Sequence, residues 1–174
     1  MKEIEVKILE IDVADIKKKL EGLGAKIIFD GTLKNIYFDT EDNSLENNGC
    51  VMRLRFDGEK AILTHKDKIT HGTVKVADET ELTVEDFDNM HKILERIGFK
   101  EKFTYSKKRI SYGLEGVHFE LDSIEGIPTF LEIESEDEEV IKKYVELLGF
   151  KQSDAKNWGT RQLCKHYGVD YCKR

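Results

Sequence analysis

Apolar and polar residues alternate along eight stretches of the chain, and in three others the apolar residues recur at helical spacing. The alternating stretches predict strands over residues 3–9, 34–39, 49–57, 60–66, 79–84, 103–112, 117–123 and 129–135. The helical stripes fall within residues 13–23, 87–97 and 140–147. Short gaps between consecutive strands, such as Asp57-Gly58-Glu59, favour antiparallel pairing. The pattern therefore predicts an α+β fold.

The same order of features occurs three times in the chain. Each copy starts with Glu-x-Glu, continues into an amphipathic helix and ends in Gly-Ala-Lys or Gly-Phe-Lys. The Glu-x-Glu pairs stand at residues 3–5, 79–81 and 132–134, and the glycines at 24, 98 and 149. Helix C-caps explain the recurring glycines but not the recurring carboxylates. The acidic pairs are therefore a second repeated feature, which needs its own explanation.

Charged residues are sorted by strand, because residues two apart on a strand share a face. Four strands carry two carboxylates each, and two strands carry two cations each. The acidic pairs are Glu3 and Glu5, Glu79 and Glu81, Glu120 and Asp122, and Glu132 and Glu134; the basic pairs are Arg53 and Arg55, and Lys107 and Arg109. A single strand of this kind is typical of a solvent-exposed sheet face. The whole set favours a bound ligand, since neighbouring like charges destabilise a sheet.

A closed eight-stranded barrel would turn these charged faces inward and leave the apolar faces for the helices to cover. Eight strands enclose room for side chains or one small ligand. Paired carboxylates inside would need divalent cations, and oxygen-only ligands select Mg²⁺ or Mn²⁺. Arginine and lysine side chains suit phosphate oxygens. Metal, cations and phosphate together indicate phosphoryl or nucleotidyl transfer.

Length and composition limit the remaining choices. The chain has 174 residues, a formal net charge of −7 and three scattered cysteines. We expect a single domain over residues 1–174. The acidic balance argues against nucleic acid as a partner, and no apolar stretch approaches the roughly 18 residues of a membrane span. Together with the scattered cysteines, these features predict a cytoplasmic protein with no membrane partner.

Motifs along the chain resemble those of a known family. Glu3-Ile4-Glu5-Val6-Lys7 resembles the Glu-x-Glu-x-Lys signature of the CYTH superfamily, the triphosphate tunnel metalloenzymes, which include class IV adenylyl cyclases and thiamine triphosphatases. Further matches follow in family order at Tyr37-Phe38-Asp39, Arg53-x-Arg55, Leu63-Thr64-His65-Lys66, Glu79-x-Glu81, Lys107-x-Arg109, Glu120-x-Asp122 and Glu132-x-Glu134. The resemblance covers nearly the whole chain.

The resemblance implies an eight-stranded antiparallel β-barrel, the triphosphate tunnel, with helices packed outside and Mg²⁺ or Mn²⁺ bound within. It implies metal ligands at Glu120, Asp122, Glu132 and Glu134, and catalytic acids at Glu3, Glu5, Glu79 and Glu81. It implies substrate contacts from Lys7, Arg53, Arg55, Lys66, Lys107, Arg109 and Lys156. The C-terminal segment, about residues 154–174, would form a helical lid. Lys156-Asn157-Trp158 stands there in place of the family's Lys-Ser-Tyr.

The residues leave several functions open. The substrate would be ATP, thiamine triphosphate or inorganic triphosphate, and the reaction either hydrolysis or cyclisation of ATP to cyclic AMP. An alternative is a non-catalytic module that binds polyphosphate or a nucleotide, although phosphate binding without metal would need only the cations. A third is an interaction domain with solvated charged strands. The sequence is consistent with either a monomer or a homodimer.

Overall fold

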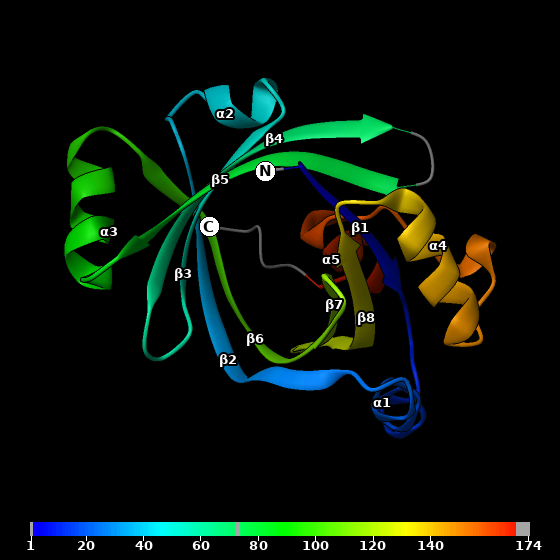
Figure 1. The fold of residues 1–174 in the computed structure, drawn as a ribbon. Helices are drawn as coiled ribbons and strands as arrows, with labels where there is room; N and C mark the ends of the chain where they lie inside the picture. The colour runs from blue at the N-terminus through cyan, green and yellow to red at the C-terminus, as the bar shows by residue number, and fades with distance from the viewer. Residues whose placement is uncertain (1, 72–73, 170–174) are drawn as a thin grey trace.

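The computed structural model describes residues 2–71 and 74–169, and its strands close into one antiparallel barrel (Figure 1). The order around the barrel is β1-β5-β4-β3-β2-β6-β7-β8. The strands are β1 (Lys2–Ile8), β2 (Lys26–Asp39), β3 (Cys50–Phe56), β4 (Ala61–His71), β5 (Val74–Val84), β6 (Lys100–Leu114), β7 (Val117–Ile124) and β8 (Ile127–Ser135). The predicted eight-stranded antiparallel barrel is confirmed.

Several strands are longer than the alternation of residues predicts. β2 and β6 pair from Lys26 with Gly113 to Asp39 with Lys100, whereas only 34–39 and 103–112 were expected. A register shift between Ile27 and Phe29 interrupts the alternation at the start of β2. Because such a bulge breaks the period of two, this part of the strand shows no clear pattern in the sequence.

The helices lie outside the barrel, as predicted. They are α1 (Val13–Gly22), α2 (Ser44–Asn47), α3 (Phe87–Arg96), α4 (Glu138–Leu147) and α5 (Thr160–Tyr167), with a 3-10 turn, η1, at Gln152–Asp154. Within the described residues, no helix has the length and apolar character needed to cross a membrane.

Local signals explain why the three repeated helices begin and end where they do. An aspartate caps each start: the side chains of Asp12, Asp86 and Asp137 accept hydrogen bonds from backbone N–H groups of the first turn. A glycine follows each end, and Gly98, for example, has φ of 106°, a conformation that favours glycine. The repeated Gly thus reverses the chain from helix into strand.

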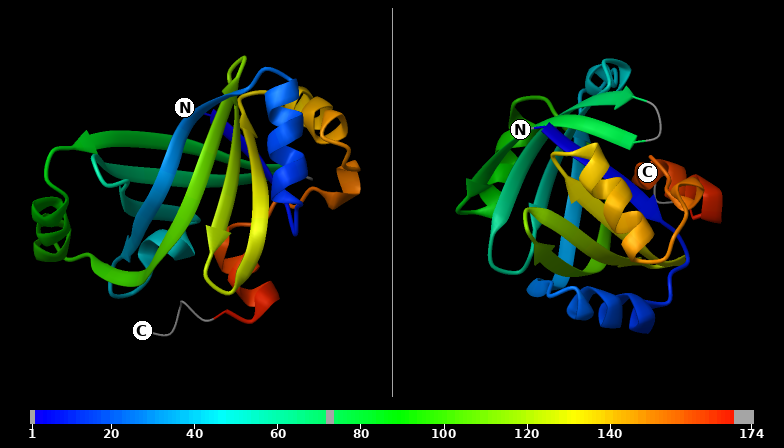
Figure 2. Two further views of the ribbon diagram at one scale, coloured as in Figure 1. Left: turned by 90° about the horizontal axis from the view of Figure 1, so that it is seen from below. Right: turned by 45° about the vertical axis from the view of Figure 1, so that its right-hand side comes forward.

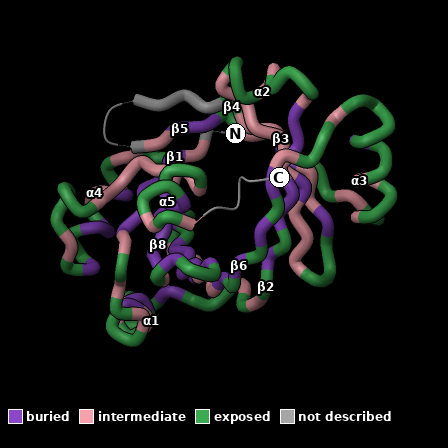
Figure 3. The backbone as a smooth tube through the Cα atoms, turned by 180° about the vertical axis from the view of Figure 1, so that it is seen from behind, coloured by how far each residue is buried: buried purple, intermediate pink, exposed green. Residues whose placement is uncertain are grey.

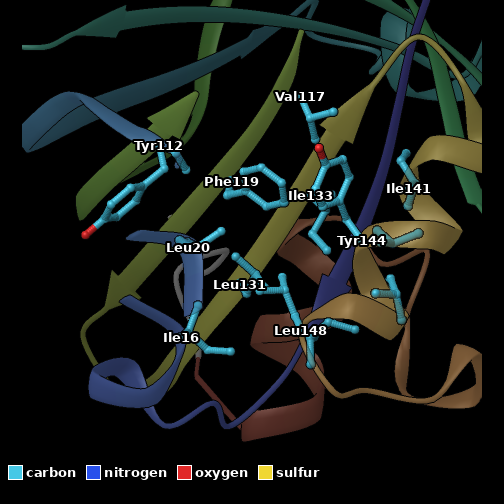
Figure 4. Close-up of a cluster of buried hydrophobic side chains, with 14 of the residues drawn as sticks. Ile16, Leu20, Tyr112, Val117, Phe119, Leu131, Ile133, Ile141, Tyr144 and Leu148 are labelled. Carbon is cyan, nitrogen blue, oxygen red and sulfur yellow. The ribbon is translucent and has the colours of Figure 1, made fainter. Parts of the chain in front are cut away.

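The main apolar core lies between the barrel wall and the helices α1 and α4. Ile4, Val6 and Ile8 of β1 are buried there, opposite the charged residues of the same strand. Leu20 of α1 and Tyr144 of α4 reach the same cluster (Figure 4). The alternation in β1 therefore separates an apolar outer face from a charged inner one.

Helix α3 covers less of the barrel than its apolar stripe predicts. It stands at the end of the barrel away from α1 and α4 (Figure 2). All residues of α3 are described, and among them Leu94 alone is buried, whereas Ile97, just beyond the helix, is 65% exposed. Figure 3 shows the contrast in burial between this largely exposed helix and the strand β8. The stripe was a correct prediction of a helix but overstated its burial.

Candidate active site in the barrel interior

The barrel encloses a cavity of about 1060 Å³ lined by the inward faces of its strands and by the start of α5. Every predicted site residue except Asp122 and Lys156 lines it. All six sorted charge pairs contribute to this lining, and Asp122 is the one member of a pair that does not reach it. The alternation rule therefore predicted the inner face. The interior is consequently a charged chamber rather than an apolar core.

Three carboxylates gather where β1 meets β8. The register pairs Glu5 with Glu134, and Lys7 with Glu132. Glu5, Glu132 and Glu134 each offer an oxygen, and these oxygens all lie within 4.8 Å of one another. The Lys7 ammonium contacts Glu5 at 2.5 Å and also contacts Glu132. The closure of the barrel between its first and last strands therefore builds a compact acidic cluster.

The charge state of this cluster follows from its burial and its neighbours. Burial, the Glu132 carboxylate and the Glu3 carboxylate raise the pKa of Glu134 well above its ordinary value. Burial opposes ionisation of Glu5 too, but Lys7 and Lys75 lower its pKa to about 2. The cluster thus favours the neutral form of Glu134 and the ionised form of Glu5. The donor set is made of oxygen alone, which fits a hard divalent cation such as Mg²⁺ or Mn²⁺.

Asp122 of β7 holds two cations of β6. Its side chain is fully buried, with Lys107 at 2.6 Å and Arg109 in a two-pronged contact at 2.7 and 2.6 Å. Arg109 also reaches Glu132 at 3.1 Å. Burial opposes ionisation of Asp122, yet Arg109 and Lys107 lower its pKa. Asp122 therefore fixes the direction of two cations without lining the cavity itself.

A second group of cations comes from β3 and β4. Lys66 contacts Glu3 at 2.9 Å and also contacts Glu79. Glu81 accepts from Thr64 at 2.7 Å and lies 3.5 Å from Arg53 and 3.7 Å from Arg55. The three acids Glu3, Glu79 and Glu81 thus each contact a cation of this group.

This second group carries crowded positive charge. Burial and the neighbouring Arg53 lower the pKa of Lys66 and also that of Arg55. An anion with several charges, placed among these side chains, would relieve the repulsion. The electrostatics of the chamber therefore favour a polyanionic ligand.

The structure adds cavity residues that sequence reasoning missed. Lys75 of β5 contacts Glu5 at 2.8 Å. It has the strand parity of Glu79 and Glu81, but the predicted strand began at residue 79. Tyr37, Phe103 and Tyr105 form an aromatic wall on β2 and β6, and the ring centroids of Tyr37 and Phe103 lie 4.2 Å apart. Tyr37 stood in a quoted motif without an assigned role.

Tyr37 should titrate at an unusually low pH for a tyrosine. Burial opposes its ionisation, but Arg53 and the hydrogen bond with Tyr105 lower its pKa to about 8. In the unfolded chain the pKa is about 10. The lowered pKa therefore stabilises the folded protein fully above about pH 10, and this contribution is lost as the pH falls through the folded value. Ultraviolet absorbance of phenolate should show one tyrosine titrating near pH 8. That titration should vanish in Tyr37→Phe, and its persistence would contradict the assignment.

Lys156 does not line the chamber. Its backbone exchanges two hydrogen bonds of 2.8 Å with the backbone of Lys7, and its ammonium donates to the carbonyl of Ser153 at 3.0 Å. This bridge occupies the edge of β1 beyond its pairing with β5. The substrate contact expected of Lys156 stays a prediction.

The expected lid is partly helical and approaches the chamber. Residues 155–159 lie between η1 and α5, and residues Gly159 to Gln162 line the cavity. Arg161 forms an ion pair with Glu46 of α2, across the mouth of the chamber. Residues 170–174 of the predicted lid lie outside the described part of the chain. The function of this segment as a lid stays a prediction, and these are the contacts through which it would close the chamber.

The fold and the site together define a closed β-barrel with a charge-lined chamber. Residues 1–154 match the CYTH domain, and the chain belongs to this family. A curated relative from Methanocaldococcus jannaschii, named a putative adenylate cyclase, is 29% identical over 154 residues, which are 85% of this chain and 88% of the relative.

Solved structures agree with the family assignment. A protein of Pyrococcus horikoshii, PH1012, superposes with a TM-score of 0.79 at 30% identity and covers 92% of this chain and 98% of its own. An adenylyl cyclase homologue from Hippeastrum, described as having a dominant triphosphatase activity, gives a TM-score of 0.62 at 21% identity and covers 99% of this chain and 91% of its own. The likeness to the Hippeastrum protein shows the fold alone.

Proposed function

We propose that this protein is a divalent-metal-dependent enzyme that hydrolyses a triphosphate bound inside the barrel. The observation that carries the proposal is the juxtaposition, in one cavity, of the acidic cluster Glu5, Glu132 and Glu134 with one group of buried cations and one group of partly buried cations. Phosphoryl transfer requires charge neutralisation and positioning more than covalent chemistry. The chamber provides groups for both.

The roles follow from the contacts of each side chain. Glu5, Glu132 and Glu134 would hold Mg²⁺ or Mn²⁺, which when bound would neutralise phosphate charge and polarise the phosphoryl group. The side chains proposed to grip the phosphates are Lys7, Arg53, Arg55, Lys66, Lys75, Lys107 and Arg109. Glu3, Glu79, Glu81, Glu120 and Asp122 would orient these cations. We thus propose orientation, rather than metal binding, for Glu120 and Asp122.

ATP cyclisation is the second candidate, favoured by the name of the Methanocaldococcus relative. It would use the same grip on the phosphates, with the substrate's own 3′-hydroxyl as nucleophile in place of water. We further propose that residues 1–174 act as one cytoplasmic domain, with the segment after residue 154 closing the chamber. Small-molecule triphosphates, rather than nucleic acid or a membrane, would be its partners.

One assay separates these activities. The protein is incubated with ATP, thiamine triphosphate or inorganic tripolyphosphate, in Mg²⁺ or Mn²⁺, and the products are identified by phosphorus NMR. Orthophosphate release would support hydrolysis, and cyclic AMP with pyrophosphate would identify a cyclase. Binding without turnover would overturn both and indicate a polyphosphate-binding module.

Arg55→Ala should weaken substrate binding more than turnover. The Arg55 side chain is 18% exposed, and its one ion pair with the described residues is to Glu81, at 3.7 Å. Its removal should therefore disturb the fold little. A lost charged hydrogen bond costs about 1.5–3 kcal/mol, which corresponds to roughly a 10- to 100-fold rise in KM. Steady-state kinetics would test this, with exposed Arg96→Ala of α3 as the matched control. An unchanged KM would remove Arg55 from the phosphate grip.

A further inference from the structure

A separate cluster of metal-ligating side chains lies on β3 and β4. Cys50 and Asp67 stand opposite each other in the register of these strands, and His65 lies two residues before Asp67. One ligand atom from each of the three lies within 4.8 Å of the others, and the Cys50 thiol donates to Asp67 at 3.0 Å. The cluster is thus assembled by strand pairing rather than by a flexible loop.

The cluster is distinct from the acidic site of the chamber. Arg53 and Lys66 point into the barrel, so Cys50, His65 and Asp67, with the opposite parity, belong to the other face of the ladder. Cys50 also borders the mouth of the cavity. Cys50 and His65 are partly buried and Asp67 is exposed, so a metal ion could reach all three from solvent.

We propose that Cys50, His65 and Asp67 form a zinc-binding site. Thiolate, imidazole and carboxylate are the ligands of zinc sites, whereas Mg²⁺ prefers oxygen alone. Zinc bonds of about 2.0–2.3 Å place tetrahedral ligand atoms roughly 3–4 Å apart, so small rotations of these side chains suffice. Three protein ligands leave the fourth position for water or an external ligand.

Zinc binding at this site would change the protonation of Cys50. The proton that the Cys50 thiol now donates to Asp67 would pass to solvent, and the thiolate would bind the metal. Affinity should therefore rise with pH. Bound zinc would also link β3 to β4 close to Arg53 and Lys66. From the opposite face of the sheet, it would help to hold these two cations in position.

Cobalt(II) added to the full chain tests the proposal, because a thiolate ligand gives an intense sulfur-to-cobalt charge-transfer band that oxygen ligands do not give. We expect this band to saturate at one equivalent, to disappear on addition of Zn²⁺, and to be absent in Cys50→Ser. His65→Ala should weaken Zn²⁺ binding by at least about tenfold, the loss that removal of even an outer-shell partner can cause.

Two control variants separate this site from others. Cys164→Ala removes a buried thiol of a different cluster and should leave the band intact. Glu134→Gln alters the chamber and should also leave it intact, so the zinc site and the proposed activity can fail independently. Absence of the band in the wild-type protein, or its survival in Cys50→Ser, would overturn the proposal.

Discussion

Replacing Glu134 by Gln is expected to reduce metal-dependent turnover by roughly 100-fold or more while leaving the metal-free fold as stable as before. Removal of a group that only supports a metal ligand typically costs about 10- to 100-fold in metal affinity or activity, and loss of a ligand itself should cost at least as much. In the metal-free protein, burial and the carboxylates of Glu132 and Glu3 raise the pKa of Glu134 and so favour its neutral form. A neutral amide of the same shape therefore changes little until a metal ion needs the carboxylate.

Two measurements check this prediction. Calorimetric titration with Mn²⁺ should show weakened binding in Glu134→Gln, and urea unfolding in a chelator should give the wild-type free energy of unfolding. Glu139→Gln is the matched control, since the Glu139 side chain is 80% exposed on α4. Near-normal turnover in Glu134→Gln would remove this residue from the metal site.

Glu132 is a less clean target, although the sequence pointed to it equally. Its carboxylate contacts both Lys7 and Arg109, and it is buried with a pKa well below its ordinary value. Glu132→Gln should also abolish metal-dependent turnover, but it would leave two buried cations with weaker partners. The loss of activity would then combine metal binding with disruption of the chamber. Only the contacts in the folded structure distinguish the two glutamates.

Alternation along the strands was sufficient to predict the chamber's inner face. Side chains at successive positions must point to opposite sides of a strand, so Arg53 and Arg55 could be placed together before their neighbours were known. The barrel followed from the conflict between sorted charge and an exposed sheet. The strand ends were harder to predict, and Lys75 was missed because its strand begins five residues earlier than the pattern indicated.

Contacts between strands far apart in sequence could not be predicted in this way. Glu5 joins Glu132 and Glu134 only because β1 closes the barrel against β8 in a particular register. Glu120 and Asp122 share a parity, yet only Glu120 of the two lines the cavity. The side chain of Asp122 is fully buried in contact with Lys107 and Arg109. Parity selects a face, whereas register and side-chain length decide which groups meet.

Asp122→Asn is expected to be the most destabilising single change in the chamber. Removing the charge would leave Lys107 and Arg109 buried without their shared carboxylate, and breaking a buried ion pair in this way costs about 3–5 kcal/mol. In a chain of this size each kcal/mol lowers Tm by roughly 2–4 °C. The substrate KM should also rise, because the two cations lose the group that directs them. Thermal unfolding and steady-state kinetics would measure both effects.

The same variant separates orientation of cations from metal binding. If Asp122 positions cations, Mn²⁺ affinity in Asp122→Asn should stay within a few-fold of wild type, a difference of about 1 kcal/mol or less; a far larger loss would restore its assignment as a metal ligand. Asp30→Asn, at an exposed position on β2, is the matched control.

The pH dependence of stability in acid provides a second check on Asp122. Because the folded pKa of Asp122 is lowered, its contribution is complete above the unfolded value of about 3.9 and declines below it. The stability gap between wild type and variant should therefore narrow only as the solution is acidified past that point, since protonation then removes the same charge that the mutation removes.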